Sequence, residues 1–148
     1  MRDVEARARP LPSRPDGAPR RQGGEADLFV TALAPNGASF ESSTYLGGTA
    51  QDEAYGIAVD PSGHAFLIGV TRSTTFPLLN PLEDGLNAQP PMGTDVSPDA
   101  LVTRIAPGGQ SLIFSTYLGG AKQDKGFAIG LDASDNVYIT GKTSSADF

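Results

Sequence analysis

The sequence contains no cysteine and no tryptophan, and its single histidine is His64. Without cysteine, the chain cannot form disulfide bonds, use a catalytic thiol, or hold zinc or iron–sulfur clusters through thiolates. One histidine cannot supply a histidine-rich metal site within one chain, and it leaves a catalytic triad with a single candidate base. Runs of apolar residues are too short to span a membrane. These absences exclude whole classes of enzyme and metal site.

Helix-forming patterns are also scarce. The 148 residues include 18 glycines and 12 prolines, and hydrophobic residues make up 39% of the chain. No stretch shows a sustained helical period of apolar residues. This composition is typical of turn-rich β structure.

The charged residues are unevenly distributed. Residues 1–26 contain six arginines, several prolines and few aliphatic side chains, a composition that predicts a disordered tail. No apolar core follows the arginines, so the tail does not match a secretory signal peptide. Residues 27–148 carry a clear excess of acidic over basic side chains. The acidic balance argues against nucleic-acid binding and favours solubility or attraction of cations.

Two segments of the chain repeat each other at an offset of 72 residues. Residues 27–76 align with 99–148 without a gap, and about 20 of the aligned pairs are identical. The hexapeptide Ser-Thr-Tyr-Leu-Gly-Gly stands at 43–48 and again at 115–120. A repeat of this kind indicates a fold built from copies of one supersecondary unit.

Each repeat is predicted to contain four short strands. Runs rich in β-branched and aromatic residues alternate with turn sequences at 35–37, 47–48 and 60–63. The strands expected in the first repeat are Leu28–Leu33, Ser39–Leu46, Tyr55–Val59 and Ala65–Val70.

These strands are apolar on both faces, whereas a sheet with one solvated face would alternate apolar and polar residues. Four-stranded sheets stacked as the blades of a propeller cover both faces. Gly56 and Ala58, with Ala128 and Gly130 in the copy, place small residues on one face of the third strand. This suits an innermost strand, where blades converge. We therefore predict an all-β fold, a partial β-propeller of about two four-stranded antiparallel blades.

The order of these motifs resembles the bacterial seven-bladed beta-propeller repeat (SBBP repeat) family. The likeness rests on the repeated hexapeptide, on residues 56–63 and 69–71, and on Phe76-Pro77, and it extends over nearly all of 27–148. It implies that the third and fourth strands of each repeat begin a blade. The chain would then hold a half blade, a whole blade (Tyr55–Gly120) and another half blade. Two features depart from the family pattern, His64 in place of the usual asparagine and the insertion loop at 77–98.

One acidic turn is a candidate calcium site. Asp132, Asp135 and Asn136 could supply three of the six to eight oxygen ligands that calcium takes. The first copy keeps only Asp60 of this set. We favour an Asx turn, in which the aspartate accepts backbone N–H groups in the hairpin. No other cofactor is expected.

Other residues that could carry chemistry have simpler interpretations. His64 follows a turn, no serine stands on a nucleophile elbow, and the copy has Asn136 at the equivalent position. We therefore expect no catalytic residue. Tyr45 and Tyr117 are expected to be buried strand residues.

The insertion loop at 77–98 carries Glu83, Asp84 and Asp95. Long loops on a rigid scaffold often bind ligands, and these acids are the candidate binding residues. A tolerated insertion without function is the equal alternative.

The sequence favours a non-enzymatic repeat module, a binding or structural scaffold within a larger bacterial protein. The alternatives are a cation-dependent adhesive module and a fragment of a propeller hydrolase or lyase whose active site lies elsewhere. The expected partners are further repeats or copies of the chain itself, and a protein or carbohydrate ligand. The family resemblance implies an extracellular or cell-surface location.

Overall fold

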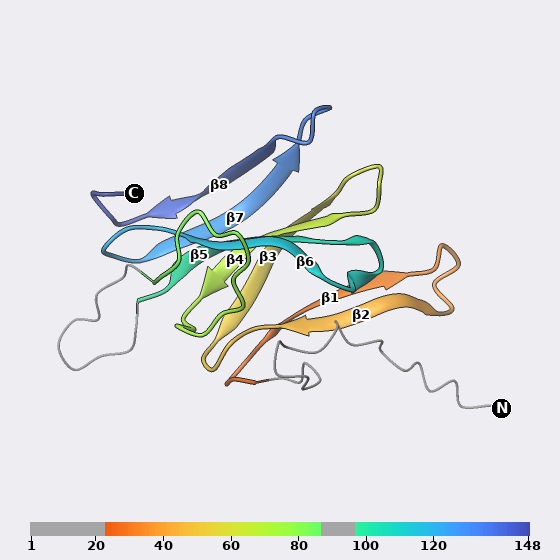
Figure 1. Ribbon diagram of the computed structural model, residues 1–148, viewed down its shortest axis with the longest axis horizontal. Coiled ribbons are helices and arrows are strands. Elements are labelled where there is room, and N and C mark those ends of the chain that lie inside the picture. Colours follow the sequence, from red (N-terminus) through yellow and green to blue (C-terminus); the bar gives the residue numbers. More distant parts are fainter. Residues whose placement is uncertain (1–22, 87–96) are drawn as a thin grey trace.

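The chain forms three antiparallel β-sheets that follow one another in chain order (Figure 1). The computed structural model of the protein describes residues 23–86 and 97–148. These residues contain no α-helix, and their only helical element is a short 3-10 turn, η1 (Pro107–Gly109). Nothing helical in them is long and apolar enough to cross a membrane. The strands are β1 (Leu28–Leu33), β2 (Phe40–Leu46), β3 (Asp52–Val59), β4 (Ala65–Thr71), β5 (Asp99–Ile105), β6 (Leu112–Leu118), β7 (Asp124–Leu131) and β8 (Val137–Thr143).

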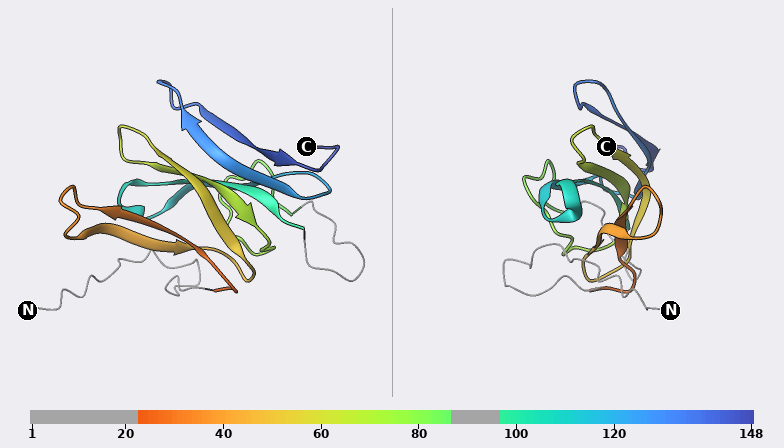
Figure 2. Two further views of the ribbon diagram at one scale, coloured as in Figure 1. Left: turned by 180° about the vertical axis from the view of Figure 1, so that it is seen from behind. Right: turned by 90° about the vertical axis from the view of Figure 1, so that its right-hand side faces the viewer.

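The middle sheet is a complete blade, and each outer sheet is half of one. The strand order of the middle sheet is β3-β4-β5-β6, and each strand pairs with the next one along the chain. β1 pairs with β2 and β7 with β8 in the two-stranded sheets. Figure 2 shows the three sheets as successive layers. The predicted arrangement of half blade, whole blade and half blade is confirmed.

The observed strands differ from the predicted ones mainly at their polar ends. β3 begins at Asp52, three residues before the predicted start at Tyr55. The Asp52 side chain at this start is buried and hydrogen-bonded. β2 begins at Phe40, one residue after the predicted start, because its pairing partner Leu33 is the last residue of β1.

The hydrophobic core lies between the first half blade and the whole blade. Leu28 and Leu46 project from β1 and β2 toward Leu67 of β4 and Tyr117 of β6. β4 and β5 are buried along nearly their whole length, since they are the central strands of the complete blade. The prediction that both faces of a blade are covered therefore holds for the central strands β4 and β5, whereas Tyr55, Ile57 and Val59 of β3 are exposed. The core residues are Leu28, Leu46, Leu67, Phe76, Leu101, Ile105 and Tyr117.

Glycines in β3 and β7 leave room for the Ile68 side chain of β4. A methyl group on Gly56 would lie 2.9 Å from Ile68 Cγ2, and one on Gly126 would overlap the Ile68 side chain. At Gly130 a methyl group would have no neighbour within 4 Å. Crowding therefore explains Gly56 and Gly126. It does not explain Gly130, because no described blade covers that part of β7.

Part of the insertion packs on the blade. Leu79 forms an antiparallel bridge with Ser115 of β6, with N···O distances of 3.2 and 2.8 Å. Leu78 and Leu86 pack against the hydrophobic core. A bridge along an outer strand covers backbone groups that would otherwise be open to pairing.

The folded region reaches one residue before the first repeat. Ala26, the last residue of the predicted tail, forms a parallel bridge with Gln51, and Asp52 N–H donates to its carbonyl at 2.7 Å. Residues 1–22 lie outside the described part of the chain.

Candidate functional site

The polar residues shared by both repeats form an anchor at the start of each inner hairpin. In the first copy, Asp52 Oδ2 accepts the N–H of Gly48 at 2.7 Å and the hydroxyl of Ser73 at 2.8 Å. Thr71 donates its hydroxyl to the other carboxylate oxygen. The anchor ties the loop after β2 to the ends of β3 and β4.

The second copy repeats this anchor. Asp124 Oδ2 accepts the N–H of Gly120 at 2.8 Å and the hydroxyl of Ser145 at 2.7 Å. These contacts explain the second glycine of the hexapeptide. A side chain at Gly48 would meet Ser73 Cβ at 2.5 Å, and one at Gly120 would meet Ser145 Cβ at 2.8 Å. The second glycine must therefore lack a side chain to reach the carboxylate.

The pKa values of the two anchor carboxyls are shifted in opposite directions. Burial raises the pKa of Asp52 despite its hydrogen bonds from Thr71, Gly48 and Ser73. Burial also acts to raise the pKa of Asp124, but hydrogen bonds led by those from Thr143 and Gly120 outweigh it and lower the pKa. These anchors were not predicted from the sequence. The signal that could have revealed them is that the Asp, Thr and Ser side chains of the anchor are identical in both repeats.

Asp60 organises the turn between β3 and β4. Its Oδ1 accepts the backbone N–H groups of Ser62 and His64, each at 2.9 Å. Its Oδ2 faces His64 Nδ1 at 2.7 Å and Arg104 Nη2 at 3.1 Å. The Arg104 guanidinium also lies over the Phe66 ring, 4.8 Å from its centroid. Burial alone would raise the pKa of Asp60, but its hydrogen bonds from His64 and Ser62 and the charge of His64 lower it.

Asp132 organises the equivalent turn between β7 and β8. Its Oδ1 accepts the backbone N–H groups of Ser134 and Asn136 at 2.8 and 2.9 Å. Its Oδ2 accepts the Asn136 side-chain amide at 2.8 Å and the Tyr138 hydroxyl at 3.1 Å. The Asn136 amide, its backbone N–H and that of Ser134 lower the pKa of Asp132 to about 2. This is the geometry that an Asx turn requires.

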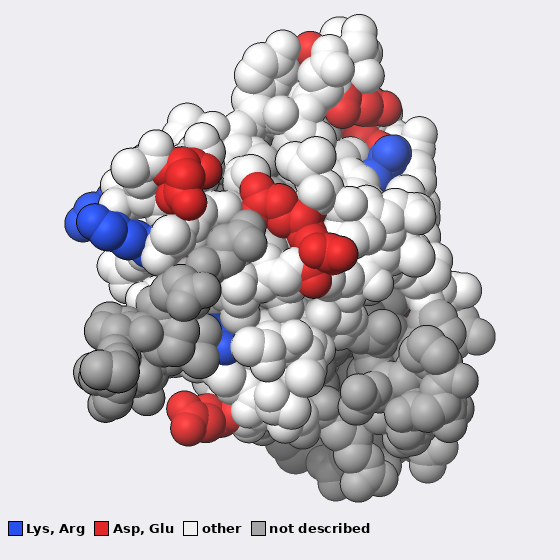
Figure 3. All heavy atoms as spheres, turned by 60° about the vertical axis from the view of Figure 1, so that its left-hand side comes forward, with Lys and Arg blue, Asp and Glu red and all other residues white. Residues whose placement is uncertain are grey.

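Two of the three calcium candidates, Asp132 and Asn136, thus bond to each other within the turn. Asn136 is bound to Asp132 through its amide nitrogen, and Asp135 occupies a left-handed backbone position with φ of 61°. No group of three or more acidic or histidine side chains in 23–86 and 97–148 could hold a metal ion. In Figure 3 the acidic side chains lie in separate patches.

The candidate acids of the insertion have different surroundings. The backbone N–H of Glu83 donates to Thr116 Oγ1 at 2.9 Å, and Glu83 Oε2 accepts the N–H of Gly119 at 3.2 Å. Asp84 is exposed. Asp95 lies outside the described residues. Glu83 thus bonds to its own blade, and Asp84 is the candidate that faces solvent.

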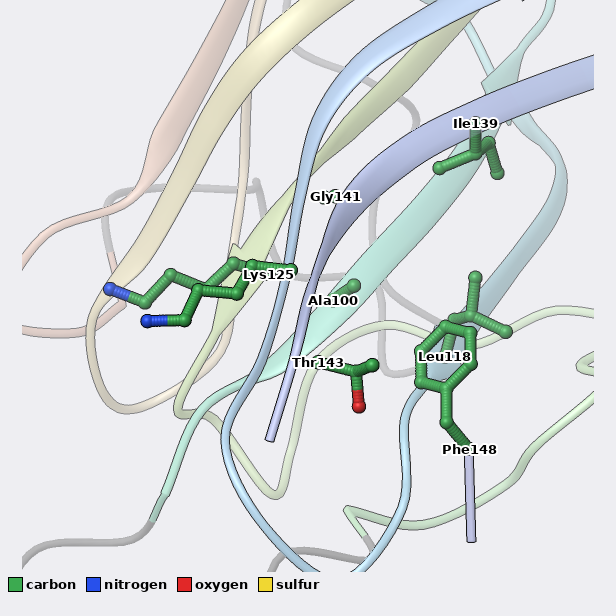
Figure 4. Close-up of a pocket in the computed structure, with 9 residues that line it drawn as sticks. Ala100, Leu118, Lys125, Ile139, Gly141, Thr143 and Phe148 are labelled. Carbon is green, nitrogen blue, oxygen red and sulfur yellow. The ribbon is translucent and has the colours of Figure 1, made fainter. Parts of the chain in front are cut away.

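A pocket of about 180 Å³ opens between the whole blade and the last half blade (Figure 4). Its apolar wall is formed by Ala100, Leu118, Ile139 and Phe148, from β5, β6, β8 and the segment after β8. Lys125 and Lys142 also line the pocket. This pocket was not predicted from the sequence.

A family model for a beta-propeller repeat matches the chain twice, at residues 43–77 and 113–148. The chain belongs to the beta-propeller repeat family. A search of curated proteins gave no match to the chain.

Each beta-propeller repeat begins in the last strand of one blade and continues through the first two strands of the next. The first match starts within β2 and includes β3 and β4, and the second starts within β6 and includes β7 and β8. Both matches contain an aspartate anchor and an Asx turn. The anchor therefore lies at the junction of two blades, where it fixes one blade to the next.

Proposed function

We propose that the chain is a non-enzymatic propeller module that serves as a binding or structural scaffold in a larger exported or cell-surface bacterial protein. One observation carries the proposal, namely that aspartates common to both repeats bind other groups of the propeller itself. Asp52 and Asp124 hold strand ends together, and Asp60 and Asp132 hold turns. Residues kept in both copies thus support the fold.

The His64 cluster supports the same conclusion. A general base must reach the proton that it removes, and it needs a nucleophile beside it. The Nδ1 atom of His64 faces Asp60 and Arg104, which belong to the turn contact and offer no hydroxyl or thiol nucleophile. In the second copy Asn136, which cannot act as a base at neutral pH, makes the equivalent side-chain bond. His64 therefore acts as a turn residue.

The experiment compares the parent protein with His64→Asn, which installs the residue of the second copy. Both proteins are assayed with ester, glycoside and polyuronate substrates, which represent hydrolase and lyase chemistry. We expect no turnover above background for either protein, and closely similar melting temperatures. Turnover by the parent that His64→Asn abolishes would overturn the non-enzymatic assignment.

The proposed location has a separate test. An antiserum against the purified chain is used on fractionated cells of the source organism. Signal in the envelope or medium is expected, and signal confined to the cytosolic fraction would contradict an exported scaffold.

A further inference from the structure

The pocket at the last half blade is the open counterpart of a closed contact at the first. Each residue of the pocket's apolar wall has a counterpart 72 positions earlier, namely Leu28 for Ala100, Leu46 for Leu118, Leu67 for Ile139 and Phe76 for Phe148. The four earlier residues are buried in the hydrophobic core. The same structural positions thus form a core at one end of the chain and a pocket at the other.

The closed contact is completed by the outer half of the whole blade. Leu101 of β5 and Tyr117 of β6 lie in the core with relative exposures of 0% and 1%. The Tyr117 hydroxyl donates to the carbonyl of Ser73 at 2.7 Å. β5 also pairs with β4 over seven residues, from Ala65 opposite Ile105 to Thr71 opposite Asp99. Among the described residues, the contact between the whole blade and the last half blade therefore has no hairpin that takes the place of β5–β6.

The chain carries such a hairpin at its other end. Phe29 of β1 and Tyr45 of β2 are the counterparts of Leu101 and Tyr117, and they pair with each other as those residues do. Their side chains are 68% and 49% exposed. Leu33, the counterpart of the buried Ile105, is exposed too. Large apolar side chains on one face of an exposed strand pair mark an interaction surface.

We propose that β1–β2 of a second copy of the chain completes the blade begun by β7–β8. β1 of the second copy pairs antiparallel with β8, with Asp27 opposite Thr143 as Asp99 is opposite Thr71. Phe29 and Tyr45 of that copy then enter the pocket, and the Tyr45 hydroxyl reaches the carbonyl of Ser145. The proposal rests on the scaffold role proposed above, and it names as the partner a second copy of this two-blade module within the larger assembly.

A second copy is the favoured occupant because the two ends of this chain are complementary halves of one structural unit. β7–β8 supplies the first two strands of a blade, and β1–β2 supplies the last two. Pairing also removes the unpaired edge of β8. The contact joins different surfaces of two copies, so it propagates until a ring closes. Each chain contributes two blades, and three or four chains would give a ring of about six or eight blades.

The first test is the oligomeric state of the full chain, measured by size-exclusion chromatography with light scattering over a hundredfold range of concentration. Phe29→Asp changes the docking face, and Leu82→Asp changes an equally apolar side chain that is 79% exposed on the insertion. We expect a defined oligomer for the parent and for Leu82→Asp. Phe29→Asp should have the mass of one chain, 15.3 kDa, with an unchanged circular dichroism spectrum.

A monomeric parent would overturn the proposal and indicate that another segment, such as a further repeat, covers the pocket. A polydisperse aggregate, or an oligomer that survives Phe29→Asp, would overturn it as well. Enzyme assays of the parent and His64→Asn do not depend on these outcomes, so failure of the partner assignment and failure of the scaffold assignment can be told apart.

The second test uses the absence of native cysteine. Phe66 pairs with Arg104 in the whole blade, and the same register places Tyr138 opposite Ala32 of the second copy. Ala32→Cys combined with Tyr138→Cys should therefore form intermolecular disulfides on mild oxidation, because paired strands bring Cα atoms within disulfide range. Ala32→Cys with Thr143→Cys is the off-register control. Equal cross-linking of the two pairs, or none in either, would overturn the proposed register.

Discussion

Tyr45 and Tyr117 stand in the same hexapeptide, yet one is half exposed and the other is buried. Both lie in the last strand of a hairpin and pair with an apolar residue of the preceding strand. Tyr117 faces the first half blade and packs with Phe76, whereas the same face of Tyr45 has no described blade beside it. The local sequence thus fixes the strand and its facing direction. Burial depends on whether the next blade is present.

The two anchor aspartates also differ between the repeats, in the pKa of the carboxyl group. Asp52 lies beside the closed contact, where burial dominates and raises its pKa. Asp124 lies beside the open pocket, where hydrogen bonds dominate and lower the pKa. The hydrogen-bond donors to the two carboxyls are nearly the same. Burial outweighs them at Asp52, where the charge of Asp27 also raises the pKa, and they outweigh burial at Asp124.

The largest expected effect is the loss of the buried tyrosine. Tyr117→Ala should lower the free energy of unfolding by about 3–5 kcal/mol, because it leaves a cavity in the core and removes the bond to Ser73. Tyr45→Ala should change it by less than about 0.5 kcal/mol in a monomer. Urea unfolding in the monomeric Phe29→Asp background measures both. Equal losses would show that burial does not distinguish the two copies.

The next largest effect concerns two glycines of β7. Gly126→Ala should destabilise by about 1–3 kcal/mol, because the added methyl group would overlap the fully buried Ile68 side chain. Gly130→Ala should be neutral or stabilising by up to about 1 kcal/mol, because its methyl group enters open space. Thermal unfolding of the monomeric background compares the two. A more harmful Gly130→Ala would place a neighbour against that face of β7.

A smaller effect should appear in the pH dependence of stability. Between the ordinary aspartate pKa of 3.8 and the raised pKa of Asp52, the folded state binds more protons, so stability falls as pH rises. Between the lowered pKa of Asp124 and 3.8, the folded state binds fewer protons, so stability rises with pH. Asp52→Asn should remove the falling component and Asp124→Asn the rising one. Urea midpoints from about pH 2 to pH 6 measure both. Variants with the same pH profile would contradict the assigned difference between the anchors.

The smallest effect is expected at the turns. Asp132→Ala should lower the melting temperature modestly through its lost turn hydrogen bonds, and millimolar calcium should not change the loss. Asp60→Ala should lower it more, because that carboxylate also binds Arg104. Differential scanning fluorimetry with calcium or with a chelator measures each variant. Stabilisation of the parent by calcium that Asp132→Ala removes would show that the turn binds the ion.

Most of the fold could be predicted from the sequence, because its determinants are local and repeated. Alternating turn chemistry and apolar runs located β1 exactly as observed and β4 to within one residue. The start of β3 at Asp52 could not be predicted, since a polar residue belongs to a strand there only when a distant Ser73 satisfies it. The candidate site was harder for the same reason. Arg104 reaches Asp60 across 44 residues, through a strand pairing that no local pattern indicates.

An all-β repeat with blade-forming hairpins follows from local and repeated signals, because strand periodicity, turn residues and internal identity act over a few residues or a fixed offset. Which copies of those residues are buried, which carboxyl has a raised pKa and where a pocket remains open are set by tertiary packing, because each depends on contacts with residues distant in the sequence. Side chains such as Tyr45 and Tyr117 have the same local sequence, but only Tyr117 has that neighbour in the described chain.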